Sequence, residues 1–590
     1  MLTALELENF KGIAERQRVD FAPLTLLFGP NSAGKSTILQ ALLYLHELLE
    51  RGGADVDRTE LGGGVVELGG FARLVHRPAM NGAIVDRAIV LRAEFTTPGG
   101  LERFGRDLAD FPFPNLDDEV ESAWLELTIR DRFTQGFNGP LVDRAVIGVG
   151  RTSDPLVEMR TGATLRDGEA VCVGVNLAHP LLASALDVSD ELGHPLPGGA
   201  AREAIDGWER IAMPRELLRL LSNVPRTPEG NTVNVSLPDA EEQRHSVTGI
   251  SLFPKWGGWD FGDERPWMVF AVSRSHFSAL PSLGEPLRII PNETDDVVED
   301  AELQKRIVRQ GYTNALQATL EELRIRERAV SQVRTFLEMI VLGTSAQLAE
   351  SLKGALYIGP LRTIPPRGSL YERRGRVASW ADGLAAWDLL LADRASVVER
   401  TNYWLKQVGA GCKVIVQQLF AEGEEYDSGE GAQGQTRQLL LDTGTVKYVF
   451  PSEVGAGVSQ VIPVIVAALE KRAGLVLVEQ PELHVHPAMQ VGLGDLFIDA
   501  ATRDGGRRTM LIETHSEHLI LRLLRRIRET TANELDGAPA FSVDQLSVLY
   551  VENQPDGVRI RRLRVDENGE FTDPWPRGFF DERFPEIYGK

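Results

Sequence analysis

The residues with the clearest capacity for chemistry form a glycine-rich loop near the start of the chain. The segment Gly29–Ser36, GPNSAGKS, fits the pattern GxxxxGK[ST] in full. It follows the apolar run Leu24–Phe28 and precedes a leucine-rich segment, 36–53, that is predicted to be a helix. Backbone N–H groups in such a loop turn toward phosphate oxygens, and the helix N-terminus adds a favourable field. The residues predicted to bind phosphates are Gly29, Asn31, Ser32, Ala33, Gly34, Lys35, Ser36 and Thr37.

Three side chains of this loop have distinct predicted roles. Lys35 is expected to reach the β- and γ-phosphates of a nucleotide, and Thr37 to contact the α-phosphate. Ser36 is expected to offer its hydroxyl oxygen to Mg²⁺. The alternative, a chance glycine-rich turn, is disfavoured because an apolar strand precedes the loop and a helix follows it.

A second group of polar residues follows an apolar segment late in the chain. Leu475–Glu479 ends in a carboxylate, and a carboxylate at the end of a buried strand beside a phosphate loop can hold Mg²⁺ directly or through water. Glu479 is therefore predicted to be a magnesium ligand. Gln480 and Glu482 are candidates for orienting an attacking water. Taken alone, the segment is explained equally well as a strand that ends in solvated charges.

Histidines gather in the same part of the chain. The segment Leu511–Ser516 is again an apolar strand that runs into polar residues, and it places His515 where it could contact a γ-phosphate. The clustered histidines are His484, His486, His515 and His518. A zinc site is disfavoured because their spacing lacks a helical HxxxH pair or cysteine partners, so packing of loops is the better explanation.

The glycine-rich segment Val454–Gln460 precedes a predicted helix, 461–471. Ser459 is expected to be the N-cap of this helix, with Pro463 in its first turn. A glycine-rich entry, a hydroxyl and exposed helix-start amides suit a second phosphate-binding end, with Gly457, Ser459 and Gln460 as its candidate residues. Considered alone, the segment is better explained as an ordinary capped helix.

These groups must be positioned by an α/β core. The apolar runs Leu475–Val478, Thr509–Ile512 and Leu546–Val551 alternate with helical segments, which predicts a mainly parallel sheet buried on both faces. Between the two ends of the chain, the expected organisation is a β-rich region, an irregular Pro- and Gly-rich region, a mostly helical region and an acidic surface loop, at residues 60–176, 177–290, 292–354 and 421–437.

Length and composition exclude several classes of protein. A chain of 590 residues is too long for one ordinary domain. Its 63 basic and 85 acidic residues give a net charge of −22, which excludes an overall basic surface but not a local basic patch. Two cysteines exclude a disulfide framework. Because we see neither a secretion signal nor an apolar run long enough for a membrane span, we expect a cytoplasmic protein with no membrane partner.

Together, the loop and the late segments resemble the ATP-binding heads of the ABC-type ATPase family, in the branch shared by SMC-like, RecF-like and OLD-like proteins. In this resemblance, Gly29–Ser36 is the Walker A segment and Gly455–Gln460 a degenerate signature loop. Leu475–Glu479 corresponds to the Walker B strand, residues 482–487 to the D-loop, and Glu513–Ser516 to the switch-histidine segment. The resemblance implies ATP and Mg²⁺ as ligands.

Three shorter runs refine the resemblance. Asn9–Gly12 is similar to the opening of that branch, where a basic residue approaches the nucleotide. Tyr357–Arg362 and Trp575–Glu582 resemble a narrower group, the prokaryotic AAA-15/AAA-21-type ATPases. Members of that group often belong to phage-defence operons, such as the Septu ATPase subunit.

The fold implied by the resemblance is an α/β P-loop head with a mixed or parallel sheet, split by a large β-rich and helical insertion. The expected domains are a first ATPase lobe with the Walker A segment and a β-rich subregion, the insertion, a second ATPase lobe and a C-terminal β segment that contains WPRGFFDE. Their expected ranges are 1–176, 177–354, 355–535 and 536–590.

The resemblance also implies a mechanism. Such heads form head-to-tail homodimers or higher oligomers, in which the signature loop of one subunit caps ATP bound by the Walker A segment of the other. Where the family usually has a catalytic glutamate, this chain has Gln480, which can orient water but is a poor base. We therefore expect slow hydrolysis, with Glu482 as the alternative carboxylate. No glutamine is a clear Q-loop candidate, because Gln40 lies too close to the Walker A segment.

The preferred functional hypothesis is an ATPase that regulates a protein effector, such as a nuclease, in anti-phage defence. A RecF- or SMC-like DNA-repair ATPase is the alternative, with nucleic acid bound by a basic cluster of Arg507, Arg508, Arg522, Arg525, Arg526 and Arg528. A self-contained OLD-type nuclease is disfavoured because few residues follow His518 and they lack a clear DxD pair. A transporter subunit is disfavoured by the insertion.

Overall fold

The fold was obtained as a computed structural model of the 590-residue chain. The structure describes residues 1–576, apart from residues 52, 61–65, 78–87, 98–99, 101–119, 135–136, 151, 166–167, 183–197, 210, 213–250, 253–266, 275–278, 280–286, 291–311, 368–369, 372–378, 393–395, 420–435, 472–473 and 507. Most of the expected acidic loop, of the irregular region and of the WPRGFFDE run lies outside the described residues. The last two residues of the expected loop, 436 and 437, belong to a strand.

The chain folds as two compact units, each made of segments that are distant in sequence. Unit 1 comprises Met1–Glu47, Val56–Arg87 and Ala349–Lys590, and unit 2 comprises Leu48–Asp55 and Ala88–Leu348. This division differs from the four expected ranges, because the strands between residues 88 and 176 group with the insertion rather than with an ATPase lobe. They do so because they form one antiparallel ladder with later strands of the insertion.

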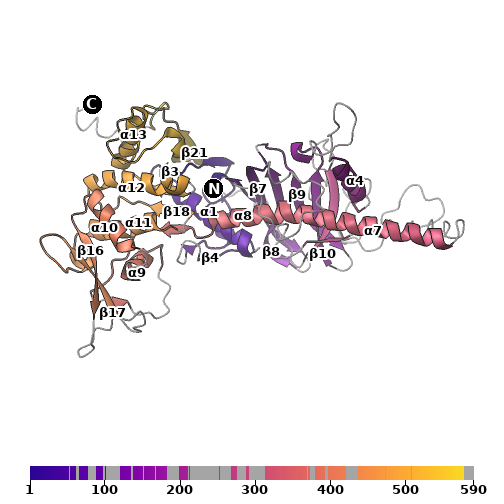
Figure 1. The fold of residues 1–590 in the computed structure, drawn as a ribbon, viewed down its shortest axis with the longest axis horizontal. Coiled ribbons are helices and arrows are strands. Elements are labelled where there is room, and N and C mark those ends of the chain that lie inside the picture. Colours follow the sequence, from indigo (N-terminus) through magenta and orange to yellow (C-terminus); the bar gives the residue numbers. More distant parts are fainter. Residues whose placement is uncertain are drawn as a thin grey trace. The chain divides into compact units, whose positions relative to one another are not determined.

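The centre of unit 1 is a six-stranded sheet in the order β14-β18-β19-β3-β20-β21. Figure 1 labels its strands β3, β18 and β21. Neighbouring strands run parallel except for β21, which is antiparallel to β20. Every residue of β3, β18 and β19 is buried, which confirms the predicted parallel sheet covered on both faces. The strands are β3 Leu24–Phe28, β14 Leu356–Ile358, β18 Leu475–Glu479, β19 Thr509–Glu513, β20 Leu546–Gln554 and β21 Gly557–Leu563.

Helices cover this sheet and share its core. Apolar side chains of β3, β18, β19 and β20 form one buried cluster with those of α9 to α13. The helices are α2 Phe71–Leu74, α9 Leu384–Ala392, α10 Val397–Gln407, α11 Ala456–Leu469, α12 Pro487–Gly506 and α13 Glu517–Thr531, with short 3-10 turns at Pro451–Glu453 and Val543–Gln545. Helices α1, Lys35–Arg51, and α8, Thr344–Leu352, each carry residues of both units.

Smaller strand groups complete unit 1. A three-stranded sheet in the order β15-β17-β16 lies beside α9 and α10 (Figure 1). β1 pairs with β2, and β4 pairs with β5, both antiparallel. The bounds are β1 Leu2–Glu8, β2 Gln17–Asp20, β4 Arg58–Thr59, β5 Val66–Glu67, β15 Leu370–Tyr371, β16 Lys413–Leu419 and β17 Thr436–Asp442.

Unit 2 contains an antiparallel ladder in the order β13-β12-β10-β9-β8-β7-β6, with β11 paired to β9. This confirms the expected β-rich character of the region before residue 176. The strands are β6 Ile89–Thr96, β7 Ser122–Thr134, β8 Phe137–Val149, β9 Val157–Leu165, β10 Gly168–Asn176, β11 Ser251–Leu252, β12 Trp267–Arg274 and β13 Arg288–Ile290.

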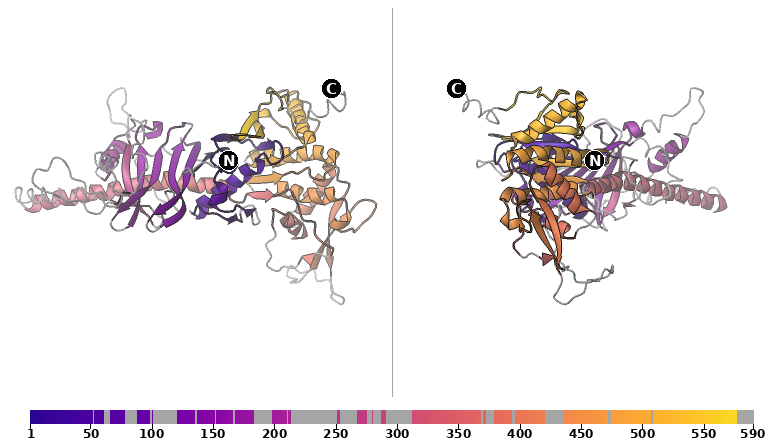
Figure 2. Two further views of the ribbon diagram at one scale, coloured as in Figure 1. Left: turned by 180° about the vertical axis from the view of Figure 1, so that it is seen from behind. Right: turned by 60° about the vertical axis from the view of Figure 1, so that its left-hand side comes forward.

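A long helix supports this ladder. Helix α7, Tyr312–Leu337, continues through a π-helical turn, Glu338–Gly343, into α8 (Figure 2). The indole of Trp208, on α4 (Gly198–Glu209), lies 5.3 Å from the ring of Phe336 and 6.4 Å from that of Phe270, centre to centre. The predicted helical character of 292–354 is thus confirmed from residue 312 to residue 352.

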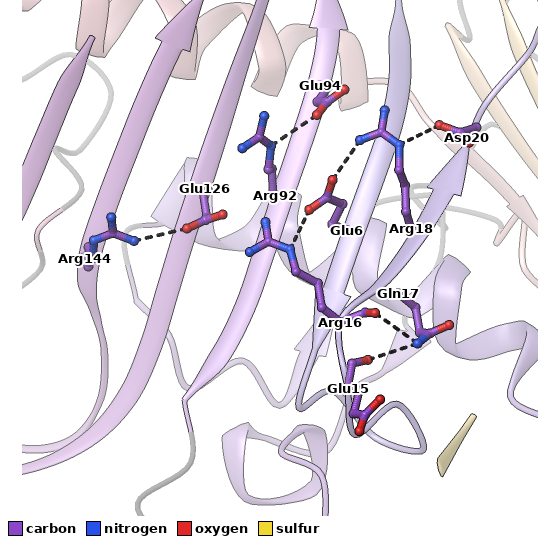
Figure 3. Close-up of polar contacts among 10 residues, drawn as sticks. All are labelled: Glu6, Glu15, Arg16, Gln17, Arg18, Asp20, Arg92, Glu94, Glu126 and Arg144. Carbon is purple, nitrogen blue, oxygen red and sulfur yellow. Dashed lines mark hydrogen bonds and ion pairs between the residues drawn. The ribbon is translucent and has the colours of Figure 1, made fainter. Parts of the chain in front are cut away.

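Ion pairs line exposed strand surfaces in each unit (Figure 3). In unit 1, Glu6 accepts hydrogen bonds from Arg16 at 2.6 Å and from Arg18 at 2.8 Å. In unit 2, Arg144 donates to Glu126 at 3.1 Å, and also to Glu158 at 2.7 Å. The exposed pairs of Arg16 and Arg18 contribute little stability individually. Glu158 is buried, so its contact with Arg144 compensates a buried charge. Among the described helices, none is long and apolar enough to cross a membrane.

Candidate functional site

The parallel register of unit 1 brings the predicted site residues to one edge of the sheet. Glu479, the last residue of β18, lies opposite Glu513, the last residue of β19. Glu513 in turn lies opposite Leu27 of β3, so Gly29 begins the phosphate loop at the same edge. The Walker A loop, the Walker B carboxylate and the switch-histidine segment, which are far apart in sequence, therefore meet.

The phosphate loop has the backbone that the sequence pattern requires. Gly29 has a φ of 147°, and a Cβ atom there would lie 2.0 Å from the carbonyl oxygen of Val551. Asn31 and Ser32 are exposed at the turn of the loop. Helix α1 begins at Lys35, so its first amides face the loop as predicted.

Lys35 is held at the loop by backbone oxygens. It is only 4% exposed, and its Nζ donates to the carbonyl oxygens of Gly29 at 3.0 Å and Pro30 at 2.9 Å. Burial lowers its pKa, while nearby carboxylates oppose that effect. A bound phosphate would give this ammonium a negatively charged partner in place of neutral carbonyls.

The predicted magnesium ligand Ser36 lies against a carboxylate that the sequence analysis did not assign to the magnesium site. Its hydroxyl donates to Oε2 of Glu513 at 2.9 Å, and Nζ of Lys35 lies 3.6 Å from Oε1 of the same residue. Glu479 instead accepts a hydrogen bond from the hydroxyl of Tyr357 at 2.9 Å. Two buried carboxylates thus share the neighbourhood of the loop.

This crowding of acids changes their ionisation. Burial, and then repulsion from Glu513, raise the pKa of Glu479 to about 7, although Tyr357, Ser36 and Lys35 oppose the shift. Burial and the same carboxylates raise the pKa of the Tyr357 hydroxyl. A divalent cation would relieve this repulsion, so the electrostatics of the site favour binding of a hard cation such as Mg²⁺.

Glu482 ties the D-loop region to the switch-histidine segment. Its Oε2 accepts from the hydroxyl of Thr514 at 2.8 Å, and its Oε1 accepts from the backbone N–H of His515 at 2.6 Å. Burial raises the pKa of Glu482. Burial, and then the charge of Lys35, lower the pKa of His515 to about 4, so its imidazole is neutral at pH 7. Both oxygens of Glu482 therefore bond to the switch-histidine segment, one to Thr514 and the other to His515.

Backbone strain marks the same region. Ser32 in the phosphate loop, Gln480 after β18 and His484 in the following turn have φ values of 61°, 44° and 61°. The left-handed region costs energy for residues other than glycine, and such residues cluster at functional sites. Gln480 is therefore held in a strained conformation directly after the predicted magnesium ligand.

The glycine-rich segment before α11 differs from its prediction. Helix α11 begins at Ala456 with Gly455 as N-cap, so Ser459 lies inside the helix and Pro463 lies beyond its first turn. Ser459 is 1% exposed, and its hydroxyl donates to the carbonyl oxygen of Pro451 at 2.6 Å. The reason is that glycine also suits an N-cap, and starting the helix earlier buries both Ser459 and the apolar face after it.

Other predicted residues of this segment also have intramolecular roles. A Cβ atom on Gly457 would lie 2.3 Å from the carbonyl oxygen of His484, so a glycine is required there. Gln460 is buried, and its side-chain amide bonds to the backbone of Arg362. Gly455 and Ala456 remain exposed, and no side chain caps the helix. The exposed groups at this end are therefore those of Gly455 and Ala456 rather than the side chains of Ser459 and Gln460.

The histidines and Lys11 are placed separately. Nδ1 of His486 accepts from the backbone N–H of Ala488 at 3.2 Å, close to the start of α12. Across the part of the chain that the structure describes, no group of three or more His, Cys, Asp or Glu side chains could hold a metal ion. The ammonium of Lys11 donates to the side-chain oxygen of Gln40 on α1.

The residues that the sequence did not single out are Glu513, Tyr357 and Arg362. Glu513 lies opposite Glu479 on the neighbouring strand. Its place beside Glu479 can be inferred from the sequence only if the order of the strands is known. Tyr357 and Arg362 lie in the run that resembles the narrower ATPase group. That resemblance is the one feature of the sequence that points to these two residues.

Comparison with known proteins supports an ATPase assignment. Residues 4–46 match a family model described as an AAA domain. Residues 414–522 match one described as an AAA domain, putative AbiEii toxin, of a type IV toxin–antitoxin system. Residues 542–587 match a family described as a protein of unknown function, DUF3696. No curated protein matches the chain.

Solved SMC head domains show a weak structural similarity. An SMC head bound to the C-winged helix domain of ScpA has a TM-score of 0.34 at 9% identity, covering 96% of this chain and 98% of that chain. The SMC head domain from Thermotoga maritima has a TM-score of 0.34 at 8% identity, with coverages of 96% and 99%. For the head with coiled coil and joint from Pyrococcus yayanosii, these values are 0.32, 8%, 95% and 97%. Similarity at this level carries no argument about function.

The two AAA-domain matches contain the segments that the structure joins. The first includes β3, the phosphate loop and most of α1, and the second includes α11, β18 and β19. Both matched segments are similar to AAA domains, and between them they contain the phosphate loop and the carboxylates that end β18 and β19. This confirms the AAA-domain part of the resemblance drawn from the sequence. Similarity to AAA domains implies ATP binding, typically with Mg²⁺.

Proposed function

We propose that this ATPase works as a nucleotide-dependent switch. Two copies associate head to tail around ATP, hydrolyse it slowly, and thereby regulate a separate protein effector, such as a nuclease, in prokaryotic anti-phage defence. The observation that carries the proposal is the exposed start of α11, where Gly455 and Ala456 face outward and no side chain caps the helix. Uncapped helix-start amides attract anions.

The proposed nucleotide site uses one chain for most of its contacts. Lys35, Ser36 and the loop amides hold the phosphates, and Glu479 and Glu513 hold Mg²⁺ together with Ser36. When bound, Mg²⁺ supplies charge that stabilises the phosphates during transfer. His515, neutral at pH 7, is the proposed γ-phosphate contact. The α11 amides of a second copy complete the site, so loss of the γ-phosphate would release the two copies.

Slow turnover follows from the residues beside the magnesium site. Gln480 occupies the position after Glu479, and an amide cannot accept a proton from water as a carboxylate does. Glu482 is the remaining carboxylate, but both of its oxygens already accept hydrogen bonds. A long-lived ATP-bound dimer is the expected consequence.

The proposed partner is a protein rather than a nucleic acid. A net charge of −22 disfavours non-specific association with nucleic acid. The description of the model that residues 414–522 match, with its putative toxin of a type IV toxin–antitoxin system, agrees with a regulatory role in defence. In this proposal, the chain is not itself a nuclease.

Sedimentation of the full chain with ATP–Mg²⁺, ADP–Mg²⁺ or no nucleotide tests this function. We expect dimers or higher oligomers only with ATP. Replacing Ala456 by Glu should abolish this association, because a carboxylate at the helix start repels phosphate yet stabilises the helix itself. Ala456→Gln is the matched neutral control and should still associate. Equal association with ATP and ADP would contradict the proposed switch.

A DNA-binding ATPase is the second candidate, because of the arginines on α13. The structure shows most of them in contact with acids or carbonyls. Arg526 and Arg522 pair with Asp495 at 2.7 and 3.0 Å, and Arg525 pairs with Glu529 at 2.6 Å. These contacts pair each of the three guanidinium groups with an acid of the same chain, and Arg507 lies outside the described residues. Salt-dependent DNA binding with a steep slope would favour this candidate instead.

A further inference from the structure

Arg362 is a buried cation that the phosphate-site chemistry does not use. It follows β14 and is only 4% exposed, whereas the preceding residue, Leu361, is 76% exposed. A buried guanidinium is costly unless its charge is compensated and its N–H groups are bonded. The contacts of Arg362 therefore indicate what it does.

The backbone of Arg362 is held by helix α11. The side-chain oxygen of Gln460 accepts from the Arg362 N–H at 3.2 Å, and the Gln460 amide nitrogen donates to the Arg362 carbonyl oxygen at 2.6 Å. Gly383 lies close to both α11 and Arg362, because a Cβ atom added there would be 3.0 Å from Pro463 and 3.4 Å from Cβ of Arg362. A shift of α11 would thus carry Arg362 with it.

The side chain of Arg362 reaches the end of the Walker B strand. Its Nη2 donates to the carbonyl oxygen of Glu479 at 2.6 Å and to that of Gln480 at 3.1 Å. These two residues are the predicted magnesium ligand and the strained residue after it. One guanidinium therefore fixes the backbone at the position where the chemistry is expected.

Two nitrogens of the guanidinium have no hydrogen-bond partner within the described part of the chain and can form new hydrogen bonds. Nε and Nη1 are buried and have no hydrogen-bond partner among the described residues. Burial lowers the pKa of the Arg362 guanidinium to about 10, and the charges of Glu482 and then Glu479 oppose this shift. The group is therefore protonated at pH 7. Buried N–H groups without partners near two carboxylates can form new bonds when the strand end moves.

We propose that Arg362 is a positioning residue that couples the start of helix α11, through Gln460, to the backbone of Glu479 and Gln480. The inference rests on the proposed function. Contact of a second copy's ATP with the start of α11 shifts the helix, Gln460 moves Arg362, and Arg362 adjusts the end of β18. Hydrolysis is thereby made dependent on capping by the partner copy.

The test compares Gln460→Ala and Arg362→Lys with wild type. Gln460→Ala removes the link without touching the buried charge, and Arg362→Lys keeps the charge but cannot reach both carbonyls with one planar group. Arg437→Lys is the matched control, because Arg437 also donates to two consecutive carbonyls, those of Leu391 and Ala392, but at the three-stranded sheet. Each variant is assayed for ATP affinity, ATP-dependent association and kcat.

We expect both test variants to bind ATP within twofold of wild type and to associate normally, but to lose at least tenfold in kcat. The double variant should lose no more than the larger single effect, because both act on one link. Arg437→Lys should match wild type in all three assays. A wild-type kcat in Gln460→Ala and Arg362→Lys, with normal association, would overturn the coupling role and leave the proposed switch intact. Failure of the wild type to associate with ATP would overturn both.

Discussion

At the residue scale, the site is a set of buried carboxylates balanced by few cations. Glu479 and Glu513 end adjacent strands, and Nζ of Lys35 in the phosphate loop lies 3.6 Å from Oε1 of Glu513. Because like charges at short range raise the free energy of ionisation, the nucleotide-free site is electrostatically unsatisfied. In the proposed function, the Mg²⁺ that accompanies ATP would relieve this repulsion, which accounts for buried acids in a site that must bind an anion.

The raised pKa of Glu479 predicts a pH-dependent stability in the nucleotide-free protein. A carboxyl whose folded pKa is about 7 binds protons more tightly folded than unfolded, so its contribution falls as pH rises from about 4.5 to 7. The loss is on the order of 3 kcal/mol. Glu479→Gln should therefore melt at a higher temperature relative to wild type at pH 8 than at pH 5, measured by calorimetry. A pH-independent difference would contradict the shift.

Glu482 and Gln480 can be separated kinetically. If Glu482 is the base, Glu482→Gln should lower the single-turnover hydrolysis rate by about 10²–10⁴-fold, as loss of a general base does. An unchanged rate would eliminate Glu482 as the base.

Gln480→Glu restores the carboxylate that the wider family usually has, and it should accelerate turnover and shorten the life of the ATP-bound state. Its failure to accelerate would argue against Gln480 as the cause of slow turnover.

At the element scale, helix α11 connects the outer surface to the catalytic edge. Its start is exposed, while Ser459 and Gln460, about one turn further along the helix, are buried and hydrogen-bonded. Ser459→Ala should cost about 1 kcal/mol of stability, the usual contribution of one hydrogen bond, with ATP binding retained. Chemical denaturation and nucleotide titration check this. A loss of ATP-dependent association without a loss of stability would instead show that the hydroxyl binds phosphate, as the sequence analysis predicts.

Gly457 offers a second test of the same element. A methyl group there would meet the carbonyl oxygen of His484 at 2.3 Å, and that atom belongs to the backbone. Gly457→Ala should therefore displace the turn after β18 and reduce ATP hydrolysis at least tenfold. The exposed Gly455, which has open space around its Cα, is the matched control, and Gly455→Ala should be tolerated. Equal effects of the two substitutions would contradict the close approach.

The elements that the sequence could predict are those with strong local signals. The bounds of Leu24–Phe28 were predicted as observed, and the phosphate loop needed only its glycines, Lys35 and the flanking periodicity. The start of α11 was misplaced because Ser459 and Gly455 both suit an N-cap, and only tertiary burial distinguishes them. Glu513 and Arg362 were not singled out because strand order and long-range contacts decide their neighbours.

At the scale of the whole molecule, two ends of the chain build the one sheet edge that carries the phosphate loop and the carboxylates. Residues 4–46 and 414–522 both match AAA domains, and β3, β18 and β19 are neighbours in a single sheet. The β-rich strands after residue 88 belong to a second unit, which contains neither the phosphate loop nor the carboxylates. Activity is therefore expected to require unit 1, and an exposed helix start in that unit is left for a second copy.

The central claim is that a complete site needs two copies of the chain. A mixture of Lys35→Ala, which cannot hold phosphate, and Ala456→Glu, which cannot cap it, tests this most directly. Each variant alone should show no ATPase activity above background. Their equimolar mixture should recover up to about one quarter of wild-type activity, because half of the dimers are mixed and each mixed dimer has one intact site. A mixture as inactive as its separate components, or full activity of Ala456→Glu alone, would contradict the account.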